Sequence, residues 1–273
     1  MIEALFDYRF LQYAFYASIL ISVIAGVIGT MIVEKKLVMM TGGIAHTSYG
    51  GVGTAFFLGI DPLLGAFAIS LLSALGIRYI KDKGKAKTDV TVGLFWSLGM
   101  ALGVLMIALT PGYPPNVESY LFGNILTVSS ADLIMMVVAT AILLFAVVIY
   151  YHYWIAYLFD DEFSTLIGIR SKAFEYVLFA LIAIAVVATI KVVGIILVIA
   201  LFTAPTATAS LFTRRMKTRM IAAVLMSMVY TLIGLFLSYT YNLAAGATIV
   251  VLAVMTYVIL ALTRSLYRHL TAH

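Results

Sequence analysis

The chain has 273 residues, of which 64% are hydrophobic and only 11% are charged, and its mean hydropathy is +1.11. This composition excludes a water-soluble globular core, because the apolar runs are far longer than a globular helix needs. The formal charge of +5 comes from Lys and Arg between those runs, where they would face anionic lipid or an acidic partner, so no nucleic-acid partner is expected. The chain has no cysteine, which excludes disulfides and thiolate metal sites.

The apolar runs predict transmembrane helices, because crossing about 30 Å of hydrocarbon takes roughly 20 helical residues. We therefore predict an all-α polytopic transmembrane bundle, a single domain over residues 1–273, with eight or nine spans. The predicted spans lie near residues 11–33, 43–60, 62–80, 91–110, 131–153, 173–190, 193–212, 220–240 and 246–266. The weakest boundary is within 173–212, where only Lys191 and Val192 separate two halves that could form one bent element.

Positive charge is distributed unevenly between the spans. Of the 17 Lys and Arg residues, all but Arg9 and Lys191 fall in alternate gaps, which are expected to be cytoplasmic. The N-terminus is then outside and the C-terminus inside. Merging 173–212 into one span would put the basic run 214–219 outside, which favours two spans. The first ten residues do not resemble a secretory signal, so the first span is expected to stay in the mature protein.

The second predicted span is unusual, because residues 40–53 contain a histidine and five glycines. Such a backbone is expected to be broken or closely packed where it borders a pathway. His46 is a functional candidate, since a neutral imidazole at membrane depth can bind a divalent metal. The alternative is that His46 hydrogen-bonds a neighbouring helix and the glycines only permit close packing. The candidate pathway backbone comprises Gly42, Gly43, Gly50 and Gly51, together with Pro205 in a later span.

The gap after the fifth predicted span has the pattern of a short amphipathic helix. Asp160 can cap it, Asp161 and Glu162 fill the first turn, Phe163 supplies an apolar side chain, and Gly168 can end it. A helix of this kind on the inner surface is typical of a docking element for a cytosolic partner. The alternative is a solvated connector without a partner.

The outer gap 111–130 is stiffened by three prolines. Within it, the apolar run 120–124 follows the prolines and should lie in the interface or dip back into the protein. Asp132 is expected to cap the next span after Ser129. Lys191 is expected to snorkel from an outer turn.

Taken together, these segments resemble the permease subunits of the ABC importers for zinc, manganese and iron. Five blocks carry the resemblance in the family's order, and they span nearly the whole chain. The blocks are residues 40–46 with the following glycines, 119–129, 159–163 with Gly168, 193–198 leading to Ala204 and Pro205, and 246–252.

The resemblance implies a homodimeric permease of the cobalamin-importer (type II) fold in the plasma membrane of a prokaryote. Its partners would be two ATPase subunits, docked at the helix after Asp160, and an extracytoplasmic solute-binding protein near Glu118. The transported zinc, manganese or iron is a substrate, and no permanently bound cofactor is implied. His46 matches the family's histidine, whereas two family aspartates appear here as Gly42 and Asn242. His46 and Asn242 from two protomers are therefore the candidate site, weak because an amide brings no charge.

Three other interpretations are weighed. The substrate of such a permease could equally be a metal chelate or another small cation. An ion-coupled secondary transporter would normally keep an acidic or basic residue at mid-membrane, and these spans contain none there. An enzyme is not favoured, because the chain lacks both a His-Glu-x-x-His motif and a Gly-rich phosphate loop, so any ATP hydrolysis must come from a separate subunit.

Overall fold

The structure is a computed structural model that describes residues 2–83, 87–112 and 117–271, and within these ranges the regular secondary structure is helical. The helices run in chain order as α1 (Ile2–Asp7), α2 (Arg9–Glu34), α3 (Val38–Leu58), α4 (Pro62–Lys83), α5 (Thr88–Leu109), α6 (Glu118–Phe122), the 3-10 turn η1 (Ile125–Thr127), α7 (Ser130–Ile149), α8 (Tyr151–Phe159), α9 (Asp161–Leu166), α10 (Ser171–Val193), α11 (Val198–Phe212), α12 (Met216–Tyr241) and α13 (Ala245–Thr271).

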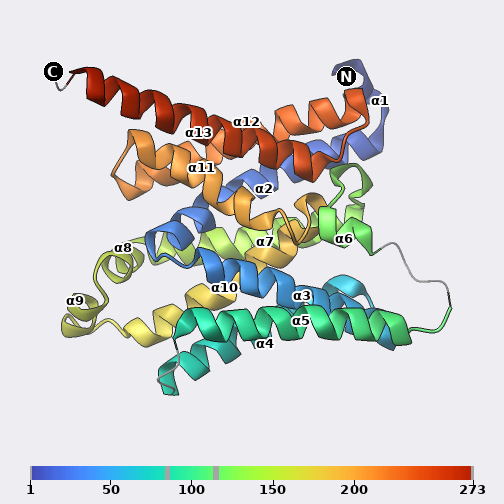
Figure 1. The fold of residues 1–273 in the computed structure, drawn as a ribbon, viewed down its shortest axis with the longest axis horizontal. Coiled ribbons are helices and arrows are strands. Elements are labelled where there is room, and N and C mark those ends of the chain that lie inside the picture. The colour runs from blue at the N-terminus through green and yellow to red at the C-terminus, as the bar shows by residue number, and fades with distance from the viewer. Residues whose placement is uncertain (1, 84–86, 113–116, 272–273) are drawn as a thin grey trace.

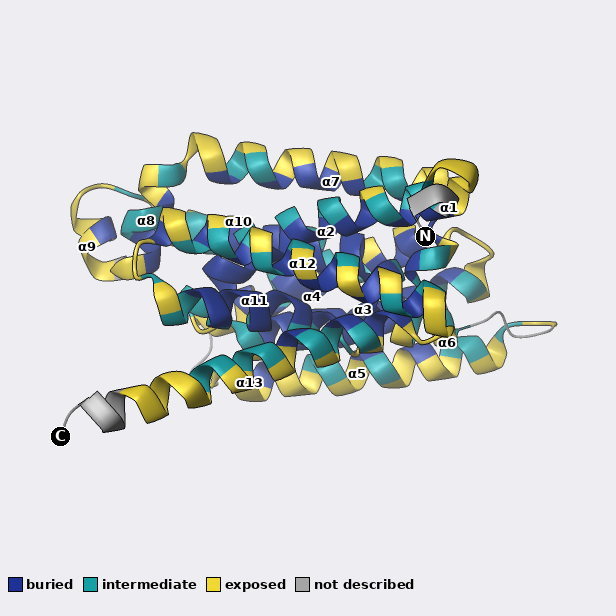
Figure 2. Ribbon diagram, turned by 90° about the horizontal axis from the view of Figure 1, so that it is seen from above, coloured by how far each residue is buried: buried dark blue, intermediate teal, exposed yellow. Residues whose placement is uncertain are grey.

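The long helices lie side by side along the longest axis of the molecule (Figure 1). The short helix α9 and the C-terminus lie at one end of this bundle, and α6 and the N-terminus lie at the other. We call these the α9 end and the α6 end. Figure 2 shows α7 on one face and α5 with α13 on the opposite face, while the buried parts of α2, α3, α10 and α11 lie between them.

All nine predicted spans coincide with helices, but they do not all qualify as membrane spans. In the described part of the chain, seven helices are long and apolar enough to cross a membrane, namely α2, α4, α5, α7, α10, α12 and α13. Helix α11 has only 15 residues, and α3 is rich in glycine and polar side chains. Every residue of α3 from Met40 to Gly53 is buried, so its neighbours are other helices. A helix enclosed in this way can carry polar residues that a lipid-facing helix could not.

The stretch 173–212 forms two helices, as the charge pattern predicts, but the position of the break differs from the expected one. Lys191 lies in the last turn of α10, and the chain leaves the helix at Gly194, whose φ is +88°. Only glycine adopts this conformation readily, so Gly194 determines where α10 ends. The expectation that Lys191 snorkels from a turn is wrong, because its ammonium pairs with Asp132 instead.

The glycine-rich segment is one continuous helix, so the expectation of a broken backbone there is wrong. The alternative expectation, close packing, is confirmed. A Cβ atom added to Gly51 would collide with the carbonyl oxygen of Gly65 in α4, and one added to Gly50 would lie 2.7 Å from the carbonyl oxygen of Gly99 in α5. The glycines therefore serve backbone-to-backbone contact on two sides of α3, which intact helices achieve without breaking.

The basic gaps meet at the α9 end. The Lys35 ammonium lies 4.3 Å from the centre of an aromatic ring in α8. Arg78, at the end of α4, pairs with Glu175 at the start of α10, and Arg219 pairs with Glu34. Segments far apart in the sequence thus bring their charges to one end of the bundle, as the alternate-gap pattern requires.

Candidate functional site

His46 lies in the interior of α3 with only 8% of its surface exposed. Its ring stacks on Trp96 of α5, with ring centroids 4.0 Å apart and an interplanar angle of 12°. Its Nδ1 atom is buried and has no hydrogen-bond partner within the described residues. Leaving a buried ring nitrogen unpaired is costly, so this atom is available to a ligand. The alternative expectation, that His46 hydrogen-bonds a neighbouring helix, is not met at Nδ1 within the described residues.

The face of α3 that carries His46 packs against α5. Gly42, His46 and Gly50 are spaced by four residues and therefore share one side of the helix. The hydroxyl of Thr47 lies 2.6 Å from the carbonyl oxygen of Gly43 and 3.2 Å from that of Phe95, so it also reaches across to α5. These contacts fix His46 against α5.

Sequence reasoning missed the α5 side of this interface. Gly99 and Gly103 face Thr47 and Tyr49 so closely that a Cβ atom at either position would overlap them. The signal was present, because Gly99 and Gly103 form a G-x-x-x-G pair, which is typical of close helix packing in membranes. Trp96 precedes this pair by three residues and so lies on the same face, which is where it meets His46.

Gly42 occupies the position of one family aspartate, and the surrounding side chains leave little room for a larger residue. A Cβ atom added there would lie 2.6 Å from Cδ1 of Ile199 in α11 and 3.2 Å from Cζ3 of Trp96. Ile199 and Trp96 thus fill the space in front of Gly42. A carboxylate at this position would require both side chains to move.

Asn242 occupies the position of the other family aspartate, but it lies on a different part of the bundle. It is exposed and forms the left-handed C-cap of α12, with φ +53°. Asparagine is favoured in this conformation for local reasons. Helix α12 packs mainly on α2, α11 and α13, whereas α3 packs mainly on α4, α5 and α10. A single copy of the chain therefore does not unite His46 with Asn242, and its described residues contain no group of three or more His, Cys, Asp or Glu that could hold a metal.

Pro205 is buried inside α11. The neighbouring turn of α11 packs on α2, since a Cβ atom added to Gly29 would lie 3.1 Å from the Thr206 hydroxyl. Ile199, rather than Pro205, is the α11 residue that meets Gly42.

Helix α9 forms as its sequence predicts. The Asp160 carboxylate accepts a hydrogen bond of 2.9 Å from the Phe163 amide, which caps the first turn. Gly168, with φ +86°, follows the end of the helix. Glu162 and Phe163 are exposed, and Leu166 is 84% exposed. The side chain of Asp161 lies outside the described part. A short helix that presents apolar side chains to solvent has the form of a docking element.

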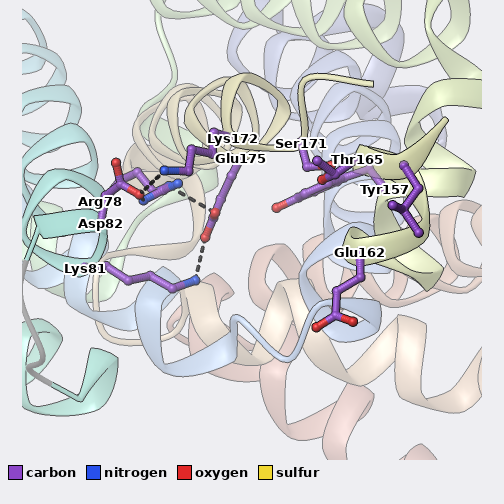
Figure 3. Close-up of a pocket in the computed structure, with 10 residues that line it drawn as sticks. Arg78, Lys81, Asp82, Tyr157, Glu162, Thr165, Ser171, Lys172 and Glu175 are labelled. Atoms are coloured by element: carbon purple, nitrogen blue, oxygen red, sulfur yellow. Dashed lines mark hydrogen bonds and ion pairs between the residues drawn. The ribbon is translucent and has the colours of Figure 1, made fainter. Parts of the chain in front are cut away.

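A pocket of about 590 Å³ lies beside α9, between the end of α4 and the start of α10. Figure 3 shows ion pairs on one side of it and Thr165 and Glu162 on the other. The Glu175 carboxylate forms ion pairs with the Arg78 guanidinium at 3.0 Å and with the Lys81 ammonium at 2.5 Å. Arg78 is only 3% exposed, so Glu175 neutralises a charge that water cannot solvate.

Two further contacts extend this cluster of charges. Lys172 of α10 pairs with Asp82 of α4 at 3.0 Å. Lys35 lies over the Tyr157 ring, and burial lowers the pKa of its ammonium, as does nearby Lys81. Burial raises the pKa of the Tyr157 phenol, which therefore stays protonated. The cluster joins α4 directly to the segment that leads out of α9.

At the α6 end, the backbone of the run after the prolines packs against the turn that follows α10, although no residue of α6 is fully buried. The amides of Ile195 and Ile196 donate to the carbonyls of Tyr120 and Leu121, at 3.0 and 3.2 Å. Three glycines from separate blocks, namely Gly123, Gly194 and Gly246, permit the close approach of these backbones. Glu118 is exposed at the start of α6.

Asp132 lies in the first turn of α7 and forms a capping box with Ser129. The predicted cap is therefore present, with Ser129 at the N-cap position. The Asp132 carboxylate also forms an ion pair with the Lys191 ammonium at 2.6 Å, which sequence reasoning missed. This pair ties α7 to the end of α10 beside the α6 segment. Both residues therefore have a structural role there.

Comparison with known proteins agrees with the resemblance over nearly the whole chain. The model of the ABC 3 transport family matches residues 7–264. An uncharacterized membrane protein of Synechocystis is 39% identical, covering 95% of this chain and 92% of that protein. The manganese transport system membrane protein MntC of Listeria monocytogenes is 32% identical, covering 94% of this chain and 92% of that protein.

Solved structures share the architecture. A chain of PsaBC from Streptococcus pneumoniae, solved in complex with Fab, superposes with a TM-score of 0.86 at 30% identity, covering 95% of this chain and 93% of that one. A metal-chelate type ABC transporter chain in an inward-facing conformation shares the fold, with a TM-score of 0.72 at 13% identity and coverage of 93% and 86%. These likenesses confirm the type II permease fold. The chain therefore belongs to the ABC 3 transport family, as a multi-pass permease of the prokaryotic plasma membrane.

Proposed function

We propose that this chain forms the translocation path of an ATP-driven importer for a divalent metal, and that manganese is the first of the three candidate metals to test. The buried, unpartnered Nδ1 of His46 carries the proposal, because it offers a metal ligand inside a family permease. Manganese is favoured over zinc and iron because two relatives named for manganese transport align with more than nine-tenths of this chain. They are MntC and the manganese import permease ScaB of Streptococcus gordonii.

Two copies of the chain would enclose the path. The surface of α5 away from α3 is exposed and apolar, with Leu94, Leu98 and Leu105 all more than half exposed. Among the seven candidate spans of the described part, α5 is the least buried within one copy, and a second copy packed on it would enclose the region beside His46. The pair would bring two His46 side chains to one path.

A site built around His46 would bind its metal weakly, because imidazole is neutral and the surrounding groups bring no negative charge. Weak binding suits a path through which the ion must pass rather than remain. The tightly bound form of the metal would then belong to the extracytoplasmic binding protein, which would deliver it at the α6 end near Glu118.

The α9 end would face the cytoplasm and two ATPase subunits. Phe163 and Leu166 are exposed there and would contact the ATPase. The ion pairs of Glu175 join the segment after α9 to α4, and the Gly51–Gly65 contact joins α4 to α3. Movement of α9 would therefore reach the helix that carries His46 through direct contacts.

The test is uptake in proteoliposomes that contain this chain, its ATPase and its binding protein. We expect ATP-dependent uptake of radioactive manganese, and the Glu162→Ala, Phe163→Ala double variant should lose binding-protein-stimulated ATPase activity while keeping its size-exclusion profile. Unchanged stimulation would contradict the docking role of α9.

The same preparation separates the alternatives. Uptake of a metal only with its chelator would favour the chelate importer. Uptake driven by an ion gradient without ATP would favour a secondary transporter.

A further inference from the structure

A groove runs between α7 and α12, on a face of the bundle away from His46. Both helices pack on α2, and in the described part the principal neighbours of α7 are α2 and α10, while those of α12 are α2, α11 and α13. The space between α7 and α12 is consequently left open over Val27 of α2. Its volume is about 350 Å³.

The walls of the groove are apolar along its length. Leu144 and Val148 of α7 form one wall, and Met220 and Ile221 of α12 form the other. These residues belong to helices that are long and apolar enough to span the membrane. The groove lies over the last turns of α7 and the first turns of α12, so its apolar part borders the hydrocarbon at the α9 end, where the headgroup-proximal part of an acyl chain is the ordinary occupant of an apolar slot.

The groove is polar and basic at one end only. Lys217 in the first turn of α12 and His152 in α8 line that end, and both side chains are exposed. The first turn of α12 has no side-chain cap, so the helix dipole adds partial positive charge at the same place. None of the residues that line the groove is acidic.

We infer that this groove is a binding site for an anionic phospholipid. Its acyl chain lies between α7 and α12, and its phosphate meets Lys217, His152 and the start of α12. The apolar walls and the single basic end match the two parts of such a lipid, because a basic residue at the membrane surface attracts an anionic headgroup.

A second copy of the chain is the competing occupant. Figure 2 shows α7 on the face opposite α5 and α13. The proposed dimer uses the α5 face, where Trp96 covers His46, and this argument rests on that proposed function. With the dimer at α5, the α7 face remains in contact with lipid.

Native mass spectrometry of the purified chain in detergent tests the inference without any transport assay. Phosphatidylglycerol and phosphatidylcholine of the same acyl composition are titrated separately. We expect phosphatidylglycerol to bind more tightly, and Lys217→Gln to weaken its binding about fivefold, the effect of one basic residue at a membrane surface. Lys83→Gln, which removes another exposed charge, at the end of α4, should leave the affinity unchanged.

A second variant tests the apolar part of the site. Leu144→Trp should fill the groove and abolish retention of copurified anionic lipid, and because Leu144 is only partly buried the size-exclusion profile should be unchanged. Equal affinity for the two lipids, or equal loss of affinity in the Lys217 and Lys83 variants, would overturn the inference. Displacement of phosphatidylglycerol by inorganic phosphate would assign the basic end to a soluble anion. Loss of the groove on dimerisation would assign it to a second copy.

Discussion

Helix α3 meets its neighbours in a different way from α4 and α10 at the α9 end. At α3 the contacts are between backbones, since Gly51 faces Gly65 and Gly50 faces Gly99 with no room for a side chain. At the α9 end the contacts are ion pairs between long side chains, centred on Glu175 and the buried Arg78. Both sets of contacts involve α4. The backbone contacts leave little room for movement, whereas the ion pairs leave more.

The difference indicates where motion can enter the bundle. Close backbone packing has one good arrangement, because a small displacement produces overlap or a void. Ion pairs between long side chains can persist over several rotamers, so their helices can shift a little without losing contact. We therefore expect α3, α4 and α5 to move as one unit, with movement of α9 transmitted to that unit through the ion pairs.

The largest effect is expected from a substitution at the backbone contact between α3 and α4. Gly51→Ala places a methyl group against the carbonyl of Gly65, and overpacking of this kind typically costs about 1–3 kcal/mol. We expect a large fall in the thermal midpoint and a loss of folded protein on fluorescence-detected size exclusion. The rigid packing of α3 would be contradicted by a variant as stable as the parent.

Gly93→Ala is the matched control for this prediction. Gly93 lies in α5, and a Cβ atom added there meets nothing within 4 Å. Alanine is a better helix former than glycine by about 1 kcal/mol, so this variant should be at least as stable as the parent. A comparable loss of stability in both variants would mean that the loss does not come from the contact between Gly51 and Gly65.

A smaller effect is expected from a substitution in the ion pairs at the α9 end. Glu175→Gln removes the carboxylate that two cations share and leaves buried Arg78 with only its longer contact of 3.6 Å to Asp82, at a cost of about 1–3 kcal/mol. We expect a moderate loss of stability and a larger loss of ATP-coupled uptake, measured in proteoliposomes.

The control is Lys172→Gln, because Lys172 is 77% exposed and its pair with Asp82 should contribute under about 1 kcal/mol. If Glu175→Gln loses stability but keeps the ratio of uptake to ATP hydrolysis, the ion pairs are structural and do not transmit movement.

The smallest effect concerns Asn242. Glycine tolerates the left-handed conformation, so Asn242→Gly should keep the end of α12 with little change in stability. Because the left-handed turn already explains the asparagine, we expect metal uptake by this variant to be close to that of the parent. A marked loss of uptake with unchanged stability would instead make the Asn242 amide a ligand on the path.

The sequence predicted the features that depend on local chemistry. Asp160 and Gly168 delimit α9 because capping and left-handed turns need only neighbouring residues. The basic gaps gather at one end because charge next to an apolar run must leave the hydrocarbon. The positions of the helices followed from the length of the apolar runs.

Features that depend on distant residues were not predictable in the same way. The break after α10 requires Gly194 to meet the backbone of Leu121, which lies far away in the sequence. Trp96 belongs to the site only because α5 packs against α3, and this packing is not apparent from the residues around Trp96. The separation of Asn242 from His46 likewise follows from which helices pack together, which neither residue encodes alone.

The central claim is that a divalent metal passes His46, and comparison of two histidine variants tests it most directly. His46→Ala and His152→Ala are each reconstituted with the ATPase and the binding protein, and ATP-dependent uptake of radioactive manganese is measured at equal amounts of folded complex. The account predicts that the His46 variant loses most of the uptake whereas the variant at exposed His152 keeps it. Equal uptake in the two variants would contradict a path past His46.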